Sequence, residues 1–242
     1  MGLRHILSNG RQRPAGPPGG VVDVLVASKD GKQPAGMECI PWETRVLVDS
    51  RAGWSQAANA LLDHAAESGR DAIFIDDDVT ILPETFAGFD RYYPLADVFG
   101  FRLRGQPGNA DQIGWTLQRP NPNAERACYL AHVTASLMYV RNAVLVAGVR
   151  FPIWPGMHFQ DIQFTYDCWL RDFAVAYVPS PALHDIAMTP AGMVGSTLRQ
   201  GEHLQERRAL NHACLDSWAR EHNLRDAAEE GRIPFGVWRI DA

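Results

Sequence analysis

The sequence contains little of what marks a nucleic-acid-binding protein. Only two of its 23 basic side chains are lysines, Lys29 and Lys32, and the arginines are dispersed along the chain. The formal net charge is −5, and there is no basic tract. Proteins that bind nucleic acid usually gather positive charge on one face or in one segment. We therefore expect no nucleic-acid partner, although arginine suits recognition of single phosphate groups.

Cysteine pairs and long apolar runs are also missing. No Cys-x-x-Cys pair occurs, so neither a zinc site nor a redox dithiol is expected from Cys39, Cys128, Cys168 and Cys214. Reduced thiols in a cytoplasmic protein are the simplest interpretation. No apolar stretch is long enough to span a bilayer, and no secretory signal follows Met1. We expect a cytoplasmic protein without a transmembrane segment. Peripheral association with the inner face of the membrane stays open, as does the oligomeric state.

The chain has the size and composition of one large α/β domain or two small ones. It has 242 residues, of which 46% are hydrophobic and 21% charged. Residues 1–20 are rich in proline and glycine and are predicted to be a flexible N-terminal arm. No internal repeat or linker divides the rest, so residues 21–242 are predicted to form a single domain.

The first part of that domain reads as strand, loop, strand, helix and strand. Apolar, β-branched runs predict strands over 21–27, 44–48 and 72–75. A helix between the last two begins with Ser55 as its predicted N-cap and stops at Gly69. This order favours a parallel sheet with helices packed against it.

The second part continues the alternation. We expect strands over 98–103, 132–140 and 174–178, and helices over 83–93, 141–148, 160–173 and about 202–222. A loop rich in glycine, proline and asparagine is expected over 105–123, and a rigid turn over 151–156.

Polar side chains follow the first three predicted strands. Ser28 follows the first strand, Asp49 the second, and the triplet Asp76, Asp77 and Asp78 the third. The carboxyl ends of parallel strands meet at one edge of a sheet, which is where open α/β sheets bind ligands. We therefore expect these side chains to form one site.

The aspartate triplet predicts a divalent cation. Three neighbouring carboxylates resist being ionised together, and Mg²⁺ or Mn²⁺ would offset their repulsion. Because alternate residues of a strand share a face, Asp76 and Asp78 are predicted to point together and Asp77 away. The alternative is a solvated acidic turn, although such turns more often contain glycine, asparagine or proline.

The order of these motifs resembles the GT-A fold nucleotide-sugar glycosyltransferases, and family 2 in particular. The resemblance covers about residues 21–222 and rests on Gly53, Asn59, the aspartate triplet, the segment 134–151 with Arg141 and Gly148, and then Asp161 and His184. The triplet with a late Asp and His is similar to bacterial galactofuranosyltransferases. Two motifs depart from the family pattern: residues 27–30 replace a Pro-Thr-x-Asn ending, and Gln160 stands where an acidic residue usually precedes Asp161.

The resemblance implies an α/β fold of the GT-A (nucleotide-diphospho-sugar transferase) type, with a mostly parallel central sheet flanked by helices. Its nucleotide-binding half would cover about 21–104 and its acceptor-side half about 105–222, followed by a tail over 223–242. The activity implied is that of an inverting, hexosyltransferase-like enzyme. It would move a sugar from a nucleotide-diphosphate sugar, with UDP as the expected nucleotide, to a hydroxyl of a glycan or glycoconjugate.

The resemblance also implies roles for individual residues. Asp76, Asp78 and His184 would hold Mn²⁺, or Mg²⁺, with the imidazole favouring Mn²⁺. Asp161, in the first turn of a helix, would be the general base, with His158 as a competitor. The donor would be held by Ser28, Asp49, Arg51, Asn59, Asp76, Asp77, Trp154 and Arg199.

Each role has a structural alternative. His184 could be a hydrogen-bonded loop residue, and Asp161 a helix N-cap or an acid favoured by the helix dipole. Asp49 could simply end a strand, and Asn59 could only tie a helix to a loop. Trp154 is equally compatible with the core, and Arg199 with a solvated face.

Two other functions remain to be distinguished. A nucleotidyltransferase of similar fold also uses carboxylates and metal, but residues 29–32 are too short for the glycine-rich basic loop that usually follows its first strand. A non-catalytic nucleotide- or sugar-binding module would keep the fold without turnover.

Overall fold

The computed structural model describes most of the chain. The described residues are 17, 20–28, 31–49, 54–104, 114, 116–117, 121, 125–154, 159–184, 188–189, 192–193 and 204–240. The predicted arm over 1–20 and loop over 105–123 therefore lie largely outside them. Among the described residues, no helix combines the length and apolarity needed to cross a membrane.

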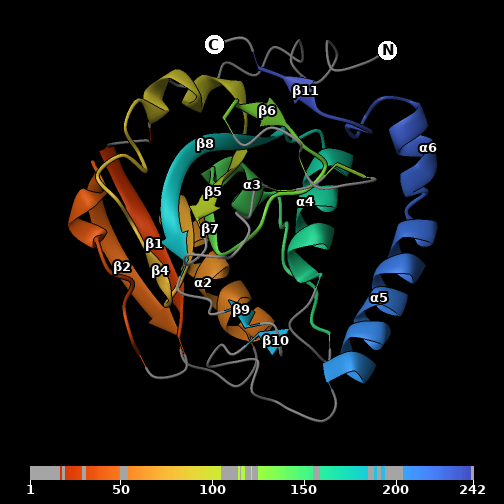
Figure 1. Cartoon of the computed structure of the whole chain (residues 1–242), viewed down its shortest axis with the longest axis horizontal. Coiled ribbons are helices and arrows are strands. Elements are labelled where there is room, and N and C mark those ends of the chain that lie inside the picture. Colours follow the sequence, from red (N-terminus) through yellow and green to blue (C-terminus); the bar gives the residue numbers. More distant parts are fainter. Residues whose placement is uncertain are drawn as a thin grey trace.

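Strands and helices alternate along the chain, and over residues 21–76 they follow the predicted order of strands with one α-helix before the third strand (Figure 1). The strands are β1 (Val21–Ala27), β2 (Glu43–Asp49), β3 (Asp71–Asp76), β4 (Val79–Thr80), β5 (Val98–Arg104), β6 (Cys128–Tyr129), β7 (Leu137–Val140), β8 (Val175–His184), β9 (Met188–Thr189), β10 (Gly192–Met193) and β11 (Trp238–Arg239). The α-helices are α2 (Trp54–Ser68), α3 (Asn142–Val146), α4 (Gln160–Leu170), α5 (Leu204–Glu221) and α6 (Leu224–Glu229), with 3₁₀ helices η2 (Met37–Cys39), η3 (Phe89–Arg91) and η4 (Tyr93–Leu95).

The central sheet is mostly parallel, which confirms the predicted fold class. Its strand order is β11-β6-β8-β5-β7-β3-β1-β2, with β4 paired to β8. β1 pairs in parallel with β2 and β3, and β5 pairs in parallel with β8. β7 runs antiparallel between β3 and β5, so its first residues lie at the edge where the parallel strands end.

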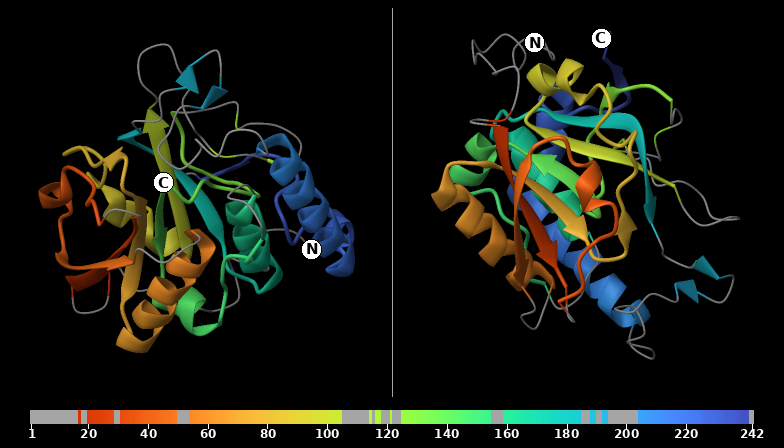
Figure 2. Two further views of the ribbon diagram at one scale, coloured as in Figure 1. Left: turned by 90° about the horizontal axis from the view of Figure 1, so that it is seen from below. Right: turned by 90° about the vertical axis from the view of Figure 1, so that its left-hand side faces the viewer.

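Different side chains cover the two faces of the sheet. Phe74 of β3 contacts Trp54 at the start of α2, with ring centroids 5.3 Å apart. Tyr139 of β7 instead contacts Trp42 and Phe89, so the segments around η2 and η3 cover the other face. The right-hand view of Figure 2 shows α2 on one side of the strands and these segments on the other. The sheet is therefore sandwiched, and its core is closed on both faces.

Several predicted boundaries are wrong. The helix expected over 83–93 is instead a series of turns with η3 and η4. Gly88 takes a left-handed conformation that ends helical geometry, and Pro94 has no N–H to continue a helix. The strand expected over 132–140 is limited to Leu137–Val140. Ser55 lies inside α2, which begins at Trp54, so it is not the N-cap. Gly69 ends α2 with φ of 71°, as predicted.

β8 is longer than predicted, because it continues through two prolines. Its register against β5 shifts between Phe101 and Arg102, which are opposite Val178 and Pro181. A bulge of this kind accommodates a proline, which has no N–H to donate to the sheet. The extended strand carries the chain on to His184, which is paired with Val79 of β4.

The C-terminal tail, which the sequence left without assigned structure, contains α6 and β11. β11 pairs with β6 at the edge of the sheet. α5 and α6 lie beyond α4, on the side away from β1 and β2 (Figure 1).

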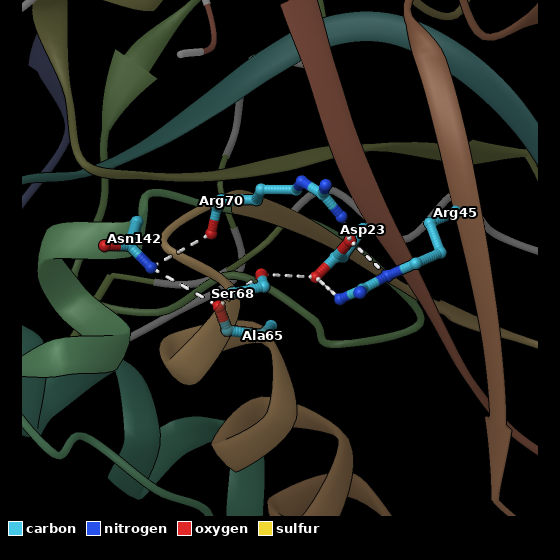
Figure 3. Close-up of polar contacts among 6 residues, drawn as sticks. All are labelled: Asp23, Arg45, Ala65, Ser68, Arg70 and Asn142. Atoms are coloured by element: carbon cyan, nitrogen blue, oxygen red, sulfur yellow. Dashed lines mark hydrogen bonds and ion pairs between the residues drawn. The ribbon is translucent and has the colours of Figure 1, made fainter. Parts of the chain in front are cut away.

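A buried polar network fixes the amino-terminal end of β1 (Figure 3). Asp23 has no exposed side-chain surface and accepts hydrogen bonds from Arg45 at 2.7 and 3.0 Å and from Ser68 at 2.7 Å. Arg70 forms a longer ion pair with it at 3.5 Å. Asn142, at the start of α3, donates to the carbonyls of Ala65 and Arg70. The network joins β1, β2 and the end of α2 at the edge opposite the strand-end polar residues.

Candidate active site

The ends of β1, β2 and β3 meet through direct hydrogen bonds. The backbone N–H of Ser28 donates to the Asp49 carbonyl at 3.1 Å. The Ser28 hydroxyl donates to Asp77 Oδ2 at 2.6 Å, and Ser28 itself is buried. Asp49 and Asp77 are half-buried. The predicted clustering of these three residues is therefore present.

The aspartate triplet divides between two partners. Asp76, the last residue of β3, donates its backbone N–H to the Ser136 carbonyl at 3.0 Å and accepts from Trp54 Nε1 at 3.3 Å. Asp77 instead contacts Ser28. Asp77 and Asp78 form the turn between β3 and β4, so strand alternation cannot align Asp78 with Asp76 as the sequence argument assumed. The side chains of Asp76 and Asp77 nevertheless point in different directions, because Asp76 contacts Trp54 and Asp77 contacts Ser28.

A small cavity joins Asp76 to Asp161. Its volume is about 110 Å³, and its lining residues are Trp54, Asp76, Thr134, Ala135, Ser136, Gln160 and Asp161. They come from the end of β3, the start of α2, the segment before β7 and the first turn of α4. Two carboxylates that are far apart in the sequence thus face one cavity at the strand-end edge.

Asp161 is held in the first turn of α4. The N-cap position is Phe159, with φ of 71°, so Asp161 is not the cap. Its Oδ1 accepts from the Ile162 N–H at 3.0 Å, and its Oδ2 lies 3.2 Å from Nε2 of His132. The Asp161 side chain is 25% exposed and that of His132 only 8%. The carboxylate therefore reaches the cavity while His132 supports it from the interior.

The surroundings keep Asp161 ionised. Burial raises the pKa of its carboxyl group, but His132 and the backbone N–H groups of Ile162 and Ala135 outweigh this effect and hold the pKa below its usual value. Burial raises the pKa of the Tyr166 phenol to about 12, and the negative charge of Asp161 contributes a smaller part of this increase. At neutral pH Asp161 is thus a carboxylate, and Tyr166 is protonated.

The segment before β7, which carries His132, packs closely onto the sheet because residue 100 is a glycine. A Cβ atom at Gly100 of β5 would lie 2.4 Å from Cβ of Val133. The glycine leaves room for Val133, which is buried, to pack onto the sheet. On the other side, Nε1 of Trp169 in α4 donates to the Leu130 carbonyl at 3.0 Å. The segment before β7 is therefore fixed against both the sheet and α4.

The predicted metal ligands are only partly described. The backbone of His184 lies opposite Val79, the residue that follows Asp78, but its side chain lies outside the described part of the structure. Among the side chains that are described, no group of three histidine, cysteine or acidic residues is arranged to hold a metal ion. Arg51, His158 and Arg199 also lie outside the described residues.

The other two predicted donor-binding residues do not line the cavity. Asn59 donates to the Phe151 carbonyl at 2.8 Å and accepts from the Phe151 N–H at 2.9 Å, so it ties α2 to the loop after α3. Trp154 is half-buried in the same loop. Direct contact of either residue with a nucleotide sugar stays a prediction.

Sequence reasoning missed several residues of the site. Trp54 begins the helix after β2, and the cavity-lining residues Thr134 and Ser136 precede β7. Recognising β7 as antiparallel would have placed them, because the start of an antiparallel strand meets the carboxyl ends of its parallel neighbours. No pattern in the sequence indicates His132, because a single histidine in a predicted strand is equally typical of a core residue.

No protein-family model matches the sequence, and no curated protein matches it. Solved structures do match. TarS of S. aureus (residues 1–349) in complex with UDP-GlcNAc has a TM-score of 0.53 at 12% identity, over 75% of this chain and 61% of that one. The fold is GT-A.

Two further structures are similar at lower scores. A197 from STIV has a TM-score of 0.49 at 12% identity, over 76% of this chain and 98% of that one. GalNAc-T7 with UDP, GalNAc and Mn²⁺ has a TM-score of 0.44 at 11% identity, over 68% and 43% of the two chains. Likenesses at such identities do not establish the chemistry of this chain.

Proposed function

We propose that the protein is a metal-dependent, inverting glycosyltransferase that moves a sugar from a nucleotide-diphosphate sugar to a hydroxyl acceptor. The observation that carries this proposal is the cavity shared by Asp76 and Asp161 at the strand-end edge of a GT-A fold. Open α/β sheets bind their ligands at this edge. The cavity also combines an ionised carboxylate with a second acidic group that is suited to a cation.

The donor would lie over the ends of β1, β2 and β3. Ser28, Asp49 and Asp77 are already connected there, and their oxygen atoms and N–H groups suit the hydroxyl and amide groups of a nucleoside. Arg51 and Arg199 would add charge for the diphosphate, and Trp154 an apolar surface for the sugar. The TarS structure contains UDP-GlcNAc, which makes a UDP-sugar the first donor to test.

The residues after β3 suit a divalent cation. Asp76 and Asp78 supply hard oxygen ligands, and the pairing of β4 with β8 brings the backbone of His184 beside the residue after Asp78. Mn²⁺ or Mg²⁺ bound there would neutralise the negative charge that develops on the diphosphate leaving group. The chain's own contribution is to hold the Asp76 carboxylate through Trp54.

Asp161 would take the proton from the acceptor hydroxyl. Its lowered pKa keeps it in the carboxylate form at neutral pH, and it lines the cavity that also contains Asp76. One base on one side of the sugar supports a single in-line displacement, which inverts the anomeric carbon. The acceptor itself, a glycan or glycoconjugate, and a galactofuranosyl or other hexosyl specificity stay predictions from the resemblance.

Product analysis tests the proposal. The full chain would be incubated with UDP-sugars and Mn²⁺, with sugar or water as acceptor, and the released nucleotide identified by chromatography. Release of UDP from wild type, and an inverted anomeric configuration by NMR, are expected. Release of pyrophosphate would instead identify a nucleotidyltransferase. Binding of UDP without any turnover in the presence of acceptor panels would contradict the catalytic assignment.

A further inference from the structure

His132 is buried beside the candidate base, and its Nε2 faces the carboxylate of Asp161. Its Nε2 lies 3.2 Å from Asp161 Oδ2. Within the described residues, neither ring nitrogen makes a hydrogen bond of good geometry, so the 3.2 Å approach to Asp161 is a contact between charged or polar atoms. A polar ring in the interior costs free energy unless a specific contact compensates it. A histidine in this position is therefore better explained by its contact with Asp161 than by packing.

The backbone around His132 is built to hold that contact. Val133 packs over Gly100, where a side chain would collide, and Trp169 of α4 donates to Leu130. α4 is thus linked to the 130–133 segment at two points, through Trp169 and through Asp161 itself. The distance between His132 and Asp161 is set by the sheet and by α4 rather than by an exposed loop.

We propose that His132 is a positioning residue for the base of the glycosyl transfer: its Nε2–H donates to Asp161 Oδ2 and fixes the carboxylate toward the cavity. The inference rests on the proposed function, because it assigns His132 to the reaction of Asp161. In that reaction the acceptor O–H bond breaks and its proton passes to Asp161. The acceptor oxygen bonds to the anomeric carbon, and the bond to the diphosphate breaks with its electron pair on the leaving group.

The role of His132 follows from geometry at the carboxylate. Oδ1 accepts from the Ile162 N–H in the same helical turn, and Oδ2 lies 3.2 Å from His132 Nε2, so an Nε2–H donated by His132 would fix the second oxygen atom as Ile162 fixes the first. Because each carboxylate oxygen has two lone pairs, both remain able to accept a proton. A rotated carboxylate would lose alignment with the acceptor, and small misplacements of a reacting group cost up to about a hundredfold in rate.

Titratable side chains of the described residues lie around Asp161 on three elements. His132 faces it from the segment before β7, Tyr166 from the next turn of α4, and Asp76 from β3 across the cavity. Tyr166 stays protonated in the acidic range, since its pKa is raised to about 12. A change in the titration of Asp161 on replacing His132 therefore reports on the loss of that contact.

Three substitutions separate a hydrogen bond from a packing role. His132→Gln keeps an N–H near the position of Nε2 without a titratable ring. His132→Asn is shorter and carries its N–H near the position of Nδ1, away from Asp161. His132→Phe fills the space and removes the donor. If the Phe variant fails to fold, the Gln and Asn pair, which are both polar and uncharged, still makes the comparison.

The direct measurement is the titration of Asp161, followed by the ¹³Cγ resonance of labelled aspartate and assigned with Asp161→Asn. His132 holds the folded-state pKa down, so the midpoint should move to higher pH in the Phe and Asn variants and return toward wild type in the Gln variant. An unchanged midpoint in all three variants, or no difference between Gln and Asn, would overturn the proposal. This measurement needs no substrate, so it stands even if the protein turns over no nucleotide sugar.

Activity gives the second readout where wild type turns over a donor. The Phe and Asn variants should lose about tenfold to a hundredfold in kcat with KM for the donor little changed, and the acidic limb of the rate profile should move to higher pH. The Gln variant should recover most of kcat. An equal loss in all three variants with an unmoved acidic limb would mean that His132 only packs, while an inactive wild type would count against the proposed function alone.

Discussion

The two ends of the sheet use acidic residues in opposite ways. At the amino end, Asp23 is fully buried, and two arginines and a serine occupy its carboxylate (Figure 3). At the carboxyl end, Asp76, Asp77 and Asp78 are half-buried and next to one another. Asp77 contacts a hydroxyl and Asp76 an indole N–H. A buried acid matched by cations has its charge compensated within the fold, whereas grouped, half-exposed acids leave charge to be neutralised by a ligand.

The Asp23 network at the amino end explains why the fold tolerates the acidic edge. The Asp23 network fixes β1, β2 and the end of α2 at one end of these elements, so the other end can carry groups that repel each other. Changes at the amino end should therefore alter stability without altering the site. Changes at the carboxyl end should alter the site without altering stability.

Removing the basicity of Asp161 should have the largest effect. Asp161→Asn keeps the shape of the side chain but cannot accept a proton, so kcat should fall about 100- to 10,000-fold. Affinity for UDP and Mn²⁺ should stay within a few fold of wild type. Steady-state kinetics and calorimetry measure the two quantities. Asp167→Asn is the matched control, since Asp167 lies on the same helix, pairs with Arg171 and should leave kcat unchanged. Full turnover in the Asp161 variant would remove it as the base.

The next effect concerns stability at the opposite edge. Arg45→Met keeps the aliphatic stem but leaves the buried Asp23 without its bidentate partner, which should cost about 3 kcal/mol of unfolding free energy. Urea denaturation gives the value. Arg225→Met, which breaks the exposed pair with Glu229, should cost less than about 1 kcal/mol. Donor affinity that fell together with stability in the Arg45 variant would contradict the separation of the two ends.

A smaller effect is expected at the junction of β1 and β3. Ser28→Ala removes the hydroxyl that holds Asp77, at a cost of about 1 kcal/mol, so donor affinity should fall about three- to tenfold. Isothermal titration calorimetry with UDP measures the change. Ser217→Ala on α5, whose hydroxyl donates to Glu221 in the same helix, provides the control and should leave affinity unaltered. Equal affinities for all three proteins would place the nucleotide elsewhere.

The parts of the site that the sequence predicts are those that a local pattern of neighbouring residues encodes. The apolar runs of β1, β2 and β3 end in Ser28, Asp49 and Asp76, so their meeting point follows from the parallel order. Asp161 is predicted from its place in the first turn of a helix, in a motif order that resembles a family. Trp54 and His132 depend on tertiary contacts with residues far away in the sequence, and no local pattern encodes such contacts.

The missed elements of the fold have the same explanation. β8 passes through Pro179 and Pro181 because β5 shifts its register to accommodate them, which only the partner strand determines. β11 has two residues and is a strand only because β6 lies beside it. In the segment 83–93, where a helix is expected, Phe89 also packs into an aromatic cluster with Phe99 and Tyr139, which are far away in the sequence.

The most direct test of the account is calorimetry of UDP binding to the wild type and to Asp78→Ala, each with and without Mn²⁺. Asp90→Ala, an exposed acid in η3, is the matched control. Mn²⁺ should strengthen UDP binding to the wild type and to the control, and Asp78→Ala should abolish this gain while leaving the fold intact by circular dichroism. UDP binding that depends neither on Mn²⁺ nor on Asp78 would contradict the assignment of this edge as a metal-assisted donor site.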